Sequence, residues 1–111
     1  MNDKLLVIIS TAEAGVARTG MMYAVNALKH CWMSEVKIFF FGPAQELLTR
    51  DAELQQLLND YQAHEGTAVA CKFLADRDDT AEPAAELGVQ VAYVGTMISE
   101  LIREGYVPMV W

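Results

Sequence analysis

The chain has 111 residues, 53% of them hydrophobic, and a formal charge of −7 at pH 7. This length and composition exclude a disordered chain and a multidomain enzyme, because a chain of this size forms one core that buries roughly two thirds of its unfolded surface. The acidic charge disfavours a general nucleic-acid-binding protein, which needs a basic surface.

The first half of the sequence predicts, in chain order, a strand, a helix, a strand and two helices. The continuous apolar run at residues 5–9 is typical of a strand that helices cover on both faces. Met21, Val25, Leu28 and Trp32 recur at helical spacing and predict the buried stripe of the following helix. The predicted elements are a strand at residues 5–9, a polar loop at 10–15, a helix at about 17–33, a strand at 36–41, a short helix at 43–48, and a helix that Asp51 caps and Gly66 ends.

The second half continues the alternation. Its last segment contains Pro108, and because proline cannot donate a hydrogen bond within a sheet, we expect this strand at a sheet edge. The predicted elements are a short strand at residues 67–71, a polar loop at 76–79, a short helix from 82 to 88, a weaker strand at 89–94, a helix from 95 to 105 and a strand at 106–111. This alternation implies an α/β fold with a mostly parallel sheet and helices on both faces.

The predicted last strand ends in an apolar run, residues 109–111. An apolar strand at a sheet edge is a site of association unless something covers it. Two explanations fit the sequence equally: a partner subunit covers this edge, or a neighbouring helix of the same chain does.

Ligands of open parallel sheets bind beyond the carboxyl ends of the strands. The residues that the sequence places there are Ser10, Thr11, Gly42, Pro43, Cys71, Lys72, Gly95 and Thr96. Cys71 is the nucleophilic side chain of this set near neutral pH, and Lys72 or a following helix N-terminus would favour its thiolate. The alternative is an inert thiol buried at a strand end. Residues 51–111 carry eleven acidic and three basic residues, a balance of −8, which opposes a thiolate in this half.

Other sites are more weakly indicated. The loop after the first strand offers hydroxyls, glycines and Arg18 to an anion, but it lacks the glycine-rich phosphate-binding motifs and contains Glu13. A flavodoxin-type flavin site there is a remote alternative. The acidic run at residues 76–79 is better explained by solvation than by a divalent ion. Cys31 and Cys71 lack metal-ligand spacing, and we expect them to lie far apart, which argues against a redox pair.

Three stretches of the sequence, in this order, resemble the DsrE/DsrF-like proteins. They are the run from Val36 to Gly42 after a strand–loop–long-helix opening, the pair Ala70-Cys71 at a strand end, and the ending from Gly88 to Tyr106. The likeness covers the whole chain, residues 1–111, as a single domain. The resemblance implies a three-layer α/β/α fold with a five-stranded sheet, in a homo-oligomer or hetero-oligomer that is typically a trimer or hexamer.

The resemblance also implies a function. Sulfur-relay members of the family carry sulfane sulfur as a persulfide on a cysteine at the position of Cys71, which takes sulfur from a donor protein and passes it to an acceptor protein. The residues expected to contact the substrate are Lys72, Ser10, Thr11, Gly42 and Gly95, and no cofactor or metal is expected. Free thiols and the lack of a long apolar segment favour the cytoplasm and no membrane. The alternative is a non-catalytic oligomeric module that binds a small ligand or partner.

Overall fold

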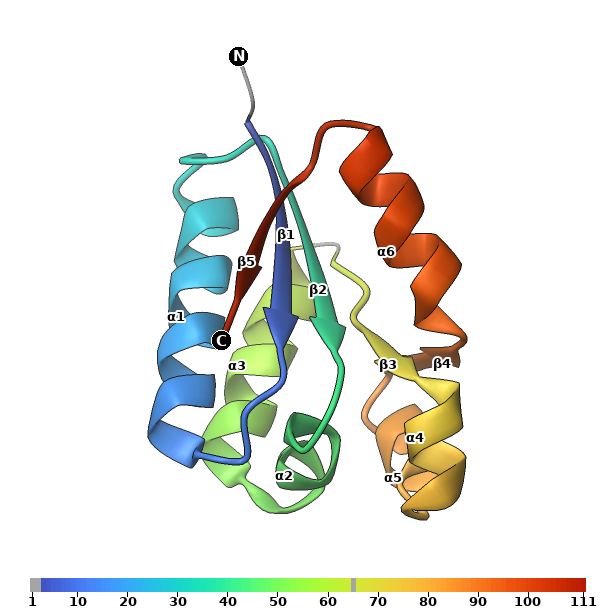
Figure 1. The fold of residues 1–111 in the computed structure, drawn as a ribbon. Helices are drawn as coiled ribbons and strands as arrows, with labels where there is room; N and C mark the ends of the chain where they lie inside the picture. The colour runs from blue at the N-terminus through green and yellow to red at the C-terminus, as the bar shows by residue number, and fades with distance from the viewer. Residues whose placement is uncertain (1–2, 65) are drawn as a thin grey trace.

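The computed structural model describes residues 3–64 and 66–111, and these form one five-stranded sheet in which every adjacent pair of strands is parallel. The order in the sheet is β4-β3-β2-β1-β5, so the two last strands of the chain lie at opposite edges (Figure 1). The strands are β1 (Lys4–Ile9), β2 (Glu35–Phe40), β3 (Val69–Cys71), β4 (Gln90–Ala92) and β5 (Val107–Val110). The predicted α/β class with a parallel five-stranded sheet is confirmed.

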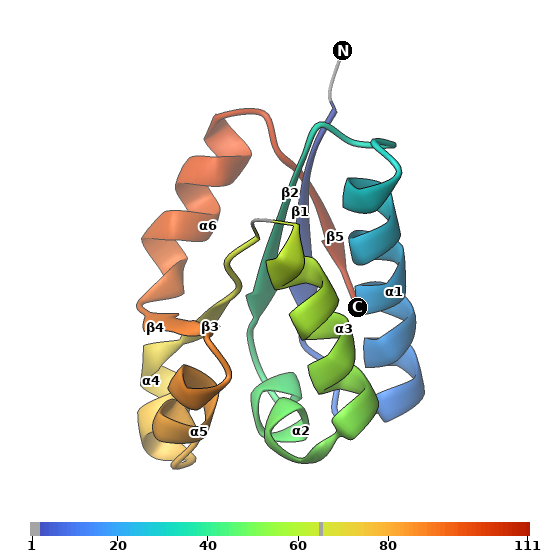
Figure 2. The same cartoon turned by 180° about the vertical axis from the view of Figure 1, so that it is seen from behind.

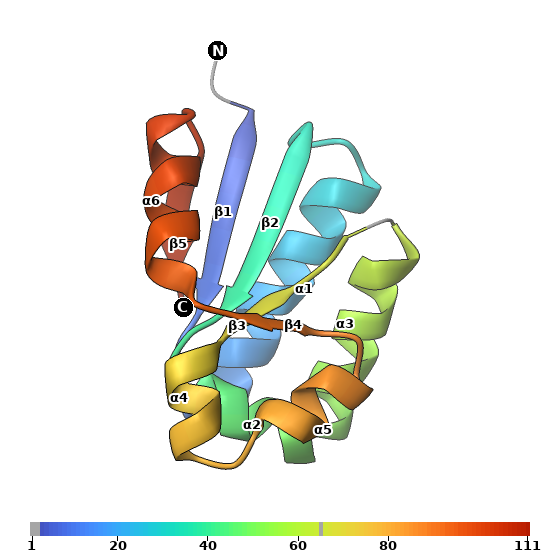
Figure 3. The ribbon, with the colours of Figure 1, turned by 90° about the vertical axis from the view of Figure 1, so that its right-hand side faces the viewer.

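Helices cover both faces of the sheet, which gives three layers (Figure 3). α1 and α3 lie side by side on one face (Figure 2), and α6 lies on the other. The helices are α1 (Ala14–Lys29), α2 (Ala44–Arg50), α3 (Ala52–Ala63), α4 (Lys72–Arg77), α5 (Ala81–Glu86) and α6 (Val94–Arg103). Across residues 3–64 and 66–111, none of the helices is long and apolar enough to cross a membrane.

The two faces of the sheet bury cores of unequal size. The larger core lies between the sheet and α1, α2 and α3, and its members include Val7, Ile38 and Leu54. The smaller core lies on the α6 side and consists of Leu6, Phe39, Val69, Cys71, Val94 and Tyr106. Within α6, Val94 is buried and the other residues are half-buried or exposed. The cover over the α6 side is therefore thinner than the cover over the α1 side.

α1 begins three residues before its predicted start because of a cap that the sequence did not indicate. The Glu13 carboxylate accepts hydrogen bonds from the backbone N–H of Gly15 at 2.9 Å and of Val16 at 2.7 Å. These amides lack partners within the helix, so the carboxylate fills the place that a serine, threonine or aspartate usually takes. The predicted loop at residues 10–15 is thus shortened by the first turn of α1.

The predicted end of α1 near residue 33 is wrong. The helix ends at Lys29, and Cys31 has a φ of 57°, a left-handed conformation that terminates a helix. Trp32 is consequently not part of the buried stripe. Its side chain is 58% exposed, and its ring stacks on that of His30 with 5.5 Å between the ring centroids.

The segment after β3 is a helix where the sequence analysis expected a loop. α4 begins at Lys72, directly after Cys71, and the predicted loop at residues 76–79 is confirmed only beyond Arg77. An ion pair of 2.7 Å between Lys72 and Asp76, one helical turn apart, stabilises α4. The left-handed conformation of Asp79, with a φ of 56°, follows its end.

The last strand lies at the sheet edge, as Pro108 predicted, and pairs with β1. Met109 and Trp111 pack against the larger core, and Trp111 lies so close to α1 that a Cβ atom on Gly20 would sit 2.5 Å from its Cγ. Val110, on the α6 side, stays 66% exposed. A neighbouring helix therefore covers one side of this edge, and the other side is open in the single chain.

α1 and α3 are joined by Asp51, which caps α3 as predicted. Its carboxylate accepts a hydrogen bond from the backbone N–H of Leu54 at 2.9 Å and a second from Arg18 Nε at 3.0 Å. The Arg18 guanidinium is the main cause that holds the pKa of the Asp51 carboxyl below its usual value, and the Leu54 amide adds to this effect. Arg18 is thereby engaged at the α1–α3 contact, which weakens the proposal of an anion site in the first loop.

Replacing Asp51 with asparagine should reduce stability in a pH-dependent way. Because the folded-state pKa of Asp51 lies below its unfolded value, its charge stabilises the fold above the unfolded pKa, and this stabilisation is lost as the pH falls through the folded pKa. The asparagine side chain keeps the helix cap but not the charge. Urea unfolding should show Asp51→Asn less stable than wild type at pH 7. The difference in the free energy of unfolding between the two proteins should disappear as the pH falls below about 4, the ordinary aspartate pKa.

A matched variant separates the cap from the charge. Asp51→Ala removes both, so it should be less stable than Asp51→Asn by about 1 kcal/mol at every pH where both fold. If the difference in the free energy of unfolding between wild type and Asp51→Asn does not become smaller on acidification, the role of the ionised carboxylate is contradicted.

Candidate functional site

The structure brings most of the predicted site segments to one edge of the sheet. β1, β2, β3 and β4 all end at this edge, followed by Ser10, Phe41, Lys72 and Tyr93 respectively (Figures 1 and 3). The register places these strand ends in one row, with Ile9 opposite Phe40, Phe40 opposite Ala70 and Cys71 opposite Ala92. We call this row the carboxyl edge. Cys71 lies in it on an interior strand, between β2 and β4.

Cys71 is the last residue of β3, and its side chain points to the α6 side of the sheet. It packs in the smaller core with Phe39, Val69 and Val94 and is 6% exposed. Its thiol is free. The thiol is therefore at the predicted place but lies just below the surface.

Cys31 lies at the opposite edge. It follows the end of α1, close to the start of β2, whereas Cys71 lies at the carboxyl edge. Both thiols are free, and Cys31 is exposed. The expectation that the two cysteines lie far apart is confirmed, because the length of the strands separates Cys31, near the start of β2, from Cys71 at the carboxyl edge.

Gln45 is a site residue that the sequence analysis missed. Its side chain is 5% exposed, and its amide Nε2 donates a hydrogen bond of 3.0 Å to the backbone carbonyl of Cys71. Its Oε1 accepts a hydrogen bond of 3.1 Å from the backbone N–H of Gly42. One side chain thus joins the ends of β2 and β3. The available signal was a polar residue among the apolar residues of a short helix, where Ala44, Leu47 and Leu48 are also buried.

Gly42 has a structural role at the carboxyl edge. Its φ is 123°, a conformation that L side chains rarely adopt, and a Cβ atom there would lie 2.6 Å from Ser10 Oγ and 3.2 Å from the Ser10 carbonyl oxygen. The same carbonyl accepts a hydrogen bond from the backbone N–H of Ala44 at 3.0 Å. Gly42 therefore lets the chain turn from β2 into α2 in close contact with the end of β1.

The backbone of Ser10 and Thr11 is already engaged. Their N–H groups donate to the carbonyl oxygen of Trp111, at 2.8 and 3.2 Å, which extends the pairing between β1 and β5. The Thr11 hydroxyl accepts a hydrogen bond from the Glu13 N–H at 3.0 Å. These two residues hold the sheet edge, so their amides are not free for an anion.

Lys72 lies beside Cys71 in sequence, but its ammonium group is directed to other partners. Its Nζ donates to the Asp76 carboxylate at 2.7 Å and lies 6.0 Å from the centroid of the Tyr93 ring. The Asp76 carboxylate holds the pKa of this ammonium above its usual value. Lys72 is therefore a fixed positive charge at the carboxyl edge, partly neutralised by its neighbour.

Gly95 lies in the first turn of α6 with open space around it. Apart from its chain neighbours and the backbone of its own helix, no atom lies within 4 Å of the position that a Cβ would take. Tyr93, the residue before α6, makes no side-chain hydrogen bond to the amides of the first turn. The surface beside β4 is thus open at Gly95.

Three exposed aromatic residues belong to segments that directly follow strands at the carboxyl edge. Phe41 follows β2, Phe73 is in α4 and Tyr93 follows β4, so each is within two residues of the row that contains Cys71. Phe73 and Tyr93 are each 64% exposed, and Phe41 is 38% exposed. We call these three residues the aromatic collar. Exposed aromatic side chains that gather in one region are typical of a protein-binding surface.

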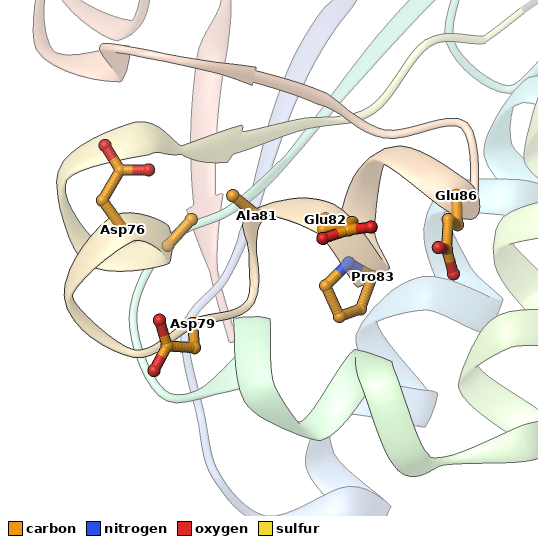
Figure 4. A pocket seen from close by; sticks show the side chains of 7 residues that line it. Asp76, Asp79, Ala81, Glu82, Pro83 and Glu86 are labelled. Atoms are coloured by element: carbon orange, nitrogen blue, oxygen red, sulfur yellow. The ribbon is translucent and has the colours of Figure 1, made fainter.

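A separate acidic pocket of about 510 Å³ lies between α4 and α5 (Figure 4). Its lining residues are Ala75, Asp76, Asp79, Ala81, Glu82, Pro83 and Glu86. Figure 4 shows the four carboxylates, those of Asp76, Asp79, Glu82 and Glu86, spread apart without a common point of convergence. Across the part of the chain that the structure describes, no group of three or more His, Cys, Asp or Glu side chains is arranged to hold a metal ion.

Solved structures of other proteins share this fold. A conserved protein of unknown function from Bacteroides thetaiotaomicron is 24% identical with a TM-score of 0.90, over 99% of this chain and 96% of that chain. The ychN protein from E. coli is 14% identical with a TM-score of 0.76, over 97% of this chain and 99% of that chain. Neither a family model nor a curated protein matches the chain. At these identities the likeness is one of fold, and the second match supports the DsrE/DsrF-like fold that the sequence resembles.

Proposed function

We propose that this chain is a small sulfur carrier that holds sulfane sulfur as a persulfide on Cys71. The observation that carries the proposal is the place of this thiol at the end of an interior strand, on the edge where parallel sheets bind ligands. The likeness to the DsrE/DsrF-like fold supports it further. A carrier thiol has to stay reduced between transfers, so we place the protein in the cytoplasm.

The proposed transfer needs no oxidant and no cofactor. The Cys71 thiolate attacks the outer sulfur of a persulfide on the donor, a bond forms between the two sulfur atoms, and the donor cysteine leaves as a thiolate. In the second half of the cycle, an acceptor thiolate attacks the outer sulfur of the Cys71 persulfide, and Cys71 leaves as a thiolate. Each half exchanges one sulfur–sulfur bond for another, so electrons balance as in thiol–disulfide exchange.

Lys72 would stabilise the negative charge of the persulfide, and the open surface at Gly95 would admit the donor. Ser10, Thr11 and Gly42 were expected to contact the substrate, but their contacts give them a structural role instead. They hold the ends of β1 and β2 that frame the site. We therefore assign these three residues to the frame and Lys72 and Gly95 to the approach of the substrate.

The thiol itself is tested by mass. The wild-type protein is incubated with glutathione persulfide, a small sulfane-sulfur donor, and its intact mass is measured under non-reducing conditions. A carrier gains one sulfur atom and loses it again on addition of a thiol acceptor. A mass that does not change would contradict the proposal.

A non-catalytic module of the same fold is the second candidate, and the burial of Cys71 favours it. Such a module would bind a partner or small ligand at the aromatic collar and leave the thiol unused. It predicts that iodoacetamide modifies native Cys71 no faster than global unfolding allows. Modification of Cys71 faster than unfolding favours the carrier.

We further propose that the aromatic collar takes part in assembly, as a homo-oligomer (a trimer or hexamer) or as a complex with the donor and acceptor proteins. Phe73→Ser and Tyr93→Ser should each change stability by less than about 0.5 kcal/mol, because both side chains are largely exposed. Each should weaken self-association by about 2 kcal/mol if its ring lies at the centre of the interface. Light scattering over a range of concentrations measures the effect.

Trp32→Ser is the matched control, since Trp32 is also a large exposed aromatic residue but follows α1 at the opposite edge. It should leave assembly unchanged. A wild-type protein that scatters only as a 12.3 kDa monomer at every concentration would refute the homo-oligomer, and the collar would then be a surface for other proteins.

A further inference from the structure

Beside Cys71, the side chain of Gln45 takes the place of the backbone hydrogen bonds that would otherwise continue the pairing of β2 with β3. The pairing of β2 with β3 extends over two register positions, Phe39 with Val69 and Phe40 with Ala70, and then ends. Beyond that point the Gln45 carboxamide lies between the segment that follows β2 and the end of β3. It accepts from the Gly42 N–H at 3.1 Å and donates to the Cys71 carbonyl at 3.0 Å. A carboxamide has the donor and acceptor of a peptide group, so it continues the hydrogen bonding where the strands separate.

We propose that Gln45 is the positioning residue of the Cys71 thiol. Its bond fixes the carbonyl of Cys71, which is the last peptide group of β3 and leads directly into α4. The direction of the Cys71 side chain and the depth of its sulfur below the surface both depend on that backbone. The inference deepens the proposed function and rests on it for the transfer step, but the positioning itself concerns only the accessibility of the thiol.

The burial of Gln45 indicates that its side chain does more than fill space in the core. A polar side chain that is 5% exposed costs free energy to bury unless its hydrogen bonds are made. An apolar residue such as the neighbouring Leu47 and Leu48 would fill the same space without that cost. What an apolar residue cannot do is hold the Gly42 amide and the Cys71 carbonyl at a fixed separation. Removing the amide would leave both backbone groups without their partner.

The chain offers two matched controls for a substitution at this position. Gln62 Nε2 donates to the Leu87 carbonyl at 3.1 Å, and Gln55 Nε2 donates to the Leu48 carbonyl at 2.9 Å. Both are glutamines of α3 with a partly buried bond from side chain to backbone, and their bonds go to carbonyls other than that of Cys71. Gln62→Met and Gln55→Met therefore measure what the loss of such a bond does to stability in general.

The test compares Gln45→Met with these controls in two measurements on the full chain. The first is the rate at which iodoacetamide modifies native Cys71, across a pH series. Gln45→Met should raise this rate about tenfold or more at every pH, because release of the Cys71 carbonyl increases the fraction of molecules with an exposed thiol. Gln62→Met and Gln55→Met should leave the rate within about twofold of wild type once stability is taken into account.

The second measurement is the rate of sulfur transfer from the Cys71 persulfide to a small thiol acceptor. Gln45→Met should raise this rate as it raises the rate of alkylation, because a small acceptor needs only access to the sulfur. Global destabilisation would move the controls in the same direction as Gln45→Met, so a separation between them is the signature of positioning. If Gln45→Met does not fold, Gln45→Glu provides the test at a pH where its carboxyl is ionised, since the carboxylate keeps an oxygen that accepts from Gly42 and has no donor for the Cys71 carbonyl.

Equal rates of Cys71 modification in Gln45→Met, Gln45→Glu and the control variants would overturn the positioning role, whether or not the protein carries sulfur. Faster modification together with no sulfur uptake by the wild type would support the positioning role and reject the carrier function. The two proposals can therefore fail independently.

Discussion

Cys71→Ser is expected to abolish sulfur uptake completely. The serine hydroxyl cannot form a persulfide, and the proposed transfer places the new sulfur–sulfur bond on this one atom. Intact mass after incubation with glutathione persulfide should show one added sulfur in the wild type and none in the variant. The hydroxyl enters the smaller core, so we also expect a loss of stability of about 1–3 kcal/mol. Circular dichroism at the assay temperature establishes that the variant is folded.

Cys31→Ser is the matched control. Cys31 is exposed and lies at the other edge of the sheet, so any reaction of a thiol with the donor that depends on exposure alone should be strongest there. The carrier proposal predicts that Cys31→Ser keeps an added sulfur that a thiol acceptor removes. Sulfur uptake that survives Cys71→Ser and disappears with Cys31→Ser would identify Cys31 as the reactive thiol and refute the assignment.

The burial of Cys71 can be reconciled with reactivity because of the unequal cores. The sulfur lies on the thin side of the sheet, under α6, whose residues apart from Val94 are half-buried or exposed. Segments with few buried apolar contacts open at a lower free energy than the whole fold. Opening of α4 or α6 would expose the thiol while the larger core around α1 and α3 stays intact. A partner that docks on the aromatic collar could select this open state.

The sequence contained enough information for the architecture. The apolar run at residues 5–9 indicated a strand covered on both faces, and Leu6 and Val7 are in fact fully buried on opposite faces. Pro108 located the edge strand because one missing donor excludes a central place. These predictions succeed since hydrophobic periodicity and proline act locally and need no knowledge of distant residues.

The errors arose where a contact outside the pattern decided the structure. Glu13 is not a preferred capping type, so the early start of α1 depends on a carboxylate that happens to reach two amides. The spacing of Trp32 fits the apolar stripe, but the left-handed conformation of Cys31 ends the helix first. By contrast, the Lys72–Asp76 pair has the spacing of a helical ion pair and could have indicated α4.

The candidate site was predictable in place but not in detail. Strand ends in a parallel sheet meet at one edge, so Gly42 and Cys71 could be placed together from the order of elements. The hydrogen bonds that join them could not be predicted in this way, because Gln45 lies 26 residues from Cys71 in the chain and reaches it only through the fold. The same holds for the contact between Gly42 and Ser10, which are far apart in sequence and neighbours at the ends of β1 and β2.

Gly42→Ala is the second substitution for which we expect a large effect. A methyl group there would stand 2.6 Å from Ser10 Oγ and 3.2 Å from the Ser10 carbonyl oxygen, and the φ of 123° is strained for alanine. The hydroxyl can rotate away, but the carbonyl cannot move without shifting the end of β1 and its bond to the Ala44 amide. Strain and overpacking together should lower the free energy of unfolding by about 2–4 kcal/mol, measured by urea denaturation.

Gly95→Ala is the control, because the two glycines follow strands at the same edge but differ in their surroundings. No atom lies near a Cβ at Gly95, and the position is in the first turn of α6, where alanine is the better helix former. This variant should be as stable as the wild type or more stable by up to about 1 kcal/mol. Because Gly42 also supplies the N–H that Gln45 holds, Gly42→Ala should expose Cys71 to iodoacetamide as Gln45→Met does, whereas Gly95→Ala should not. A Gly42→Ala protein with wild-type stability and an unchanged Cys71 reaction rate would show that the carboxyl edge tolerates rearrangement, and the frame assigned to Ser10, Thr11 and Gly42 would then be wrong.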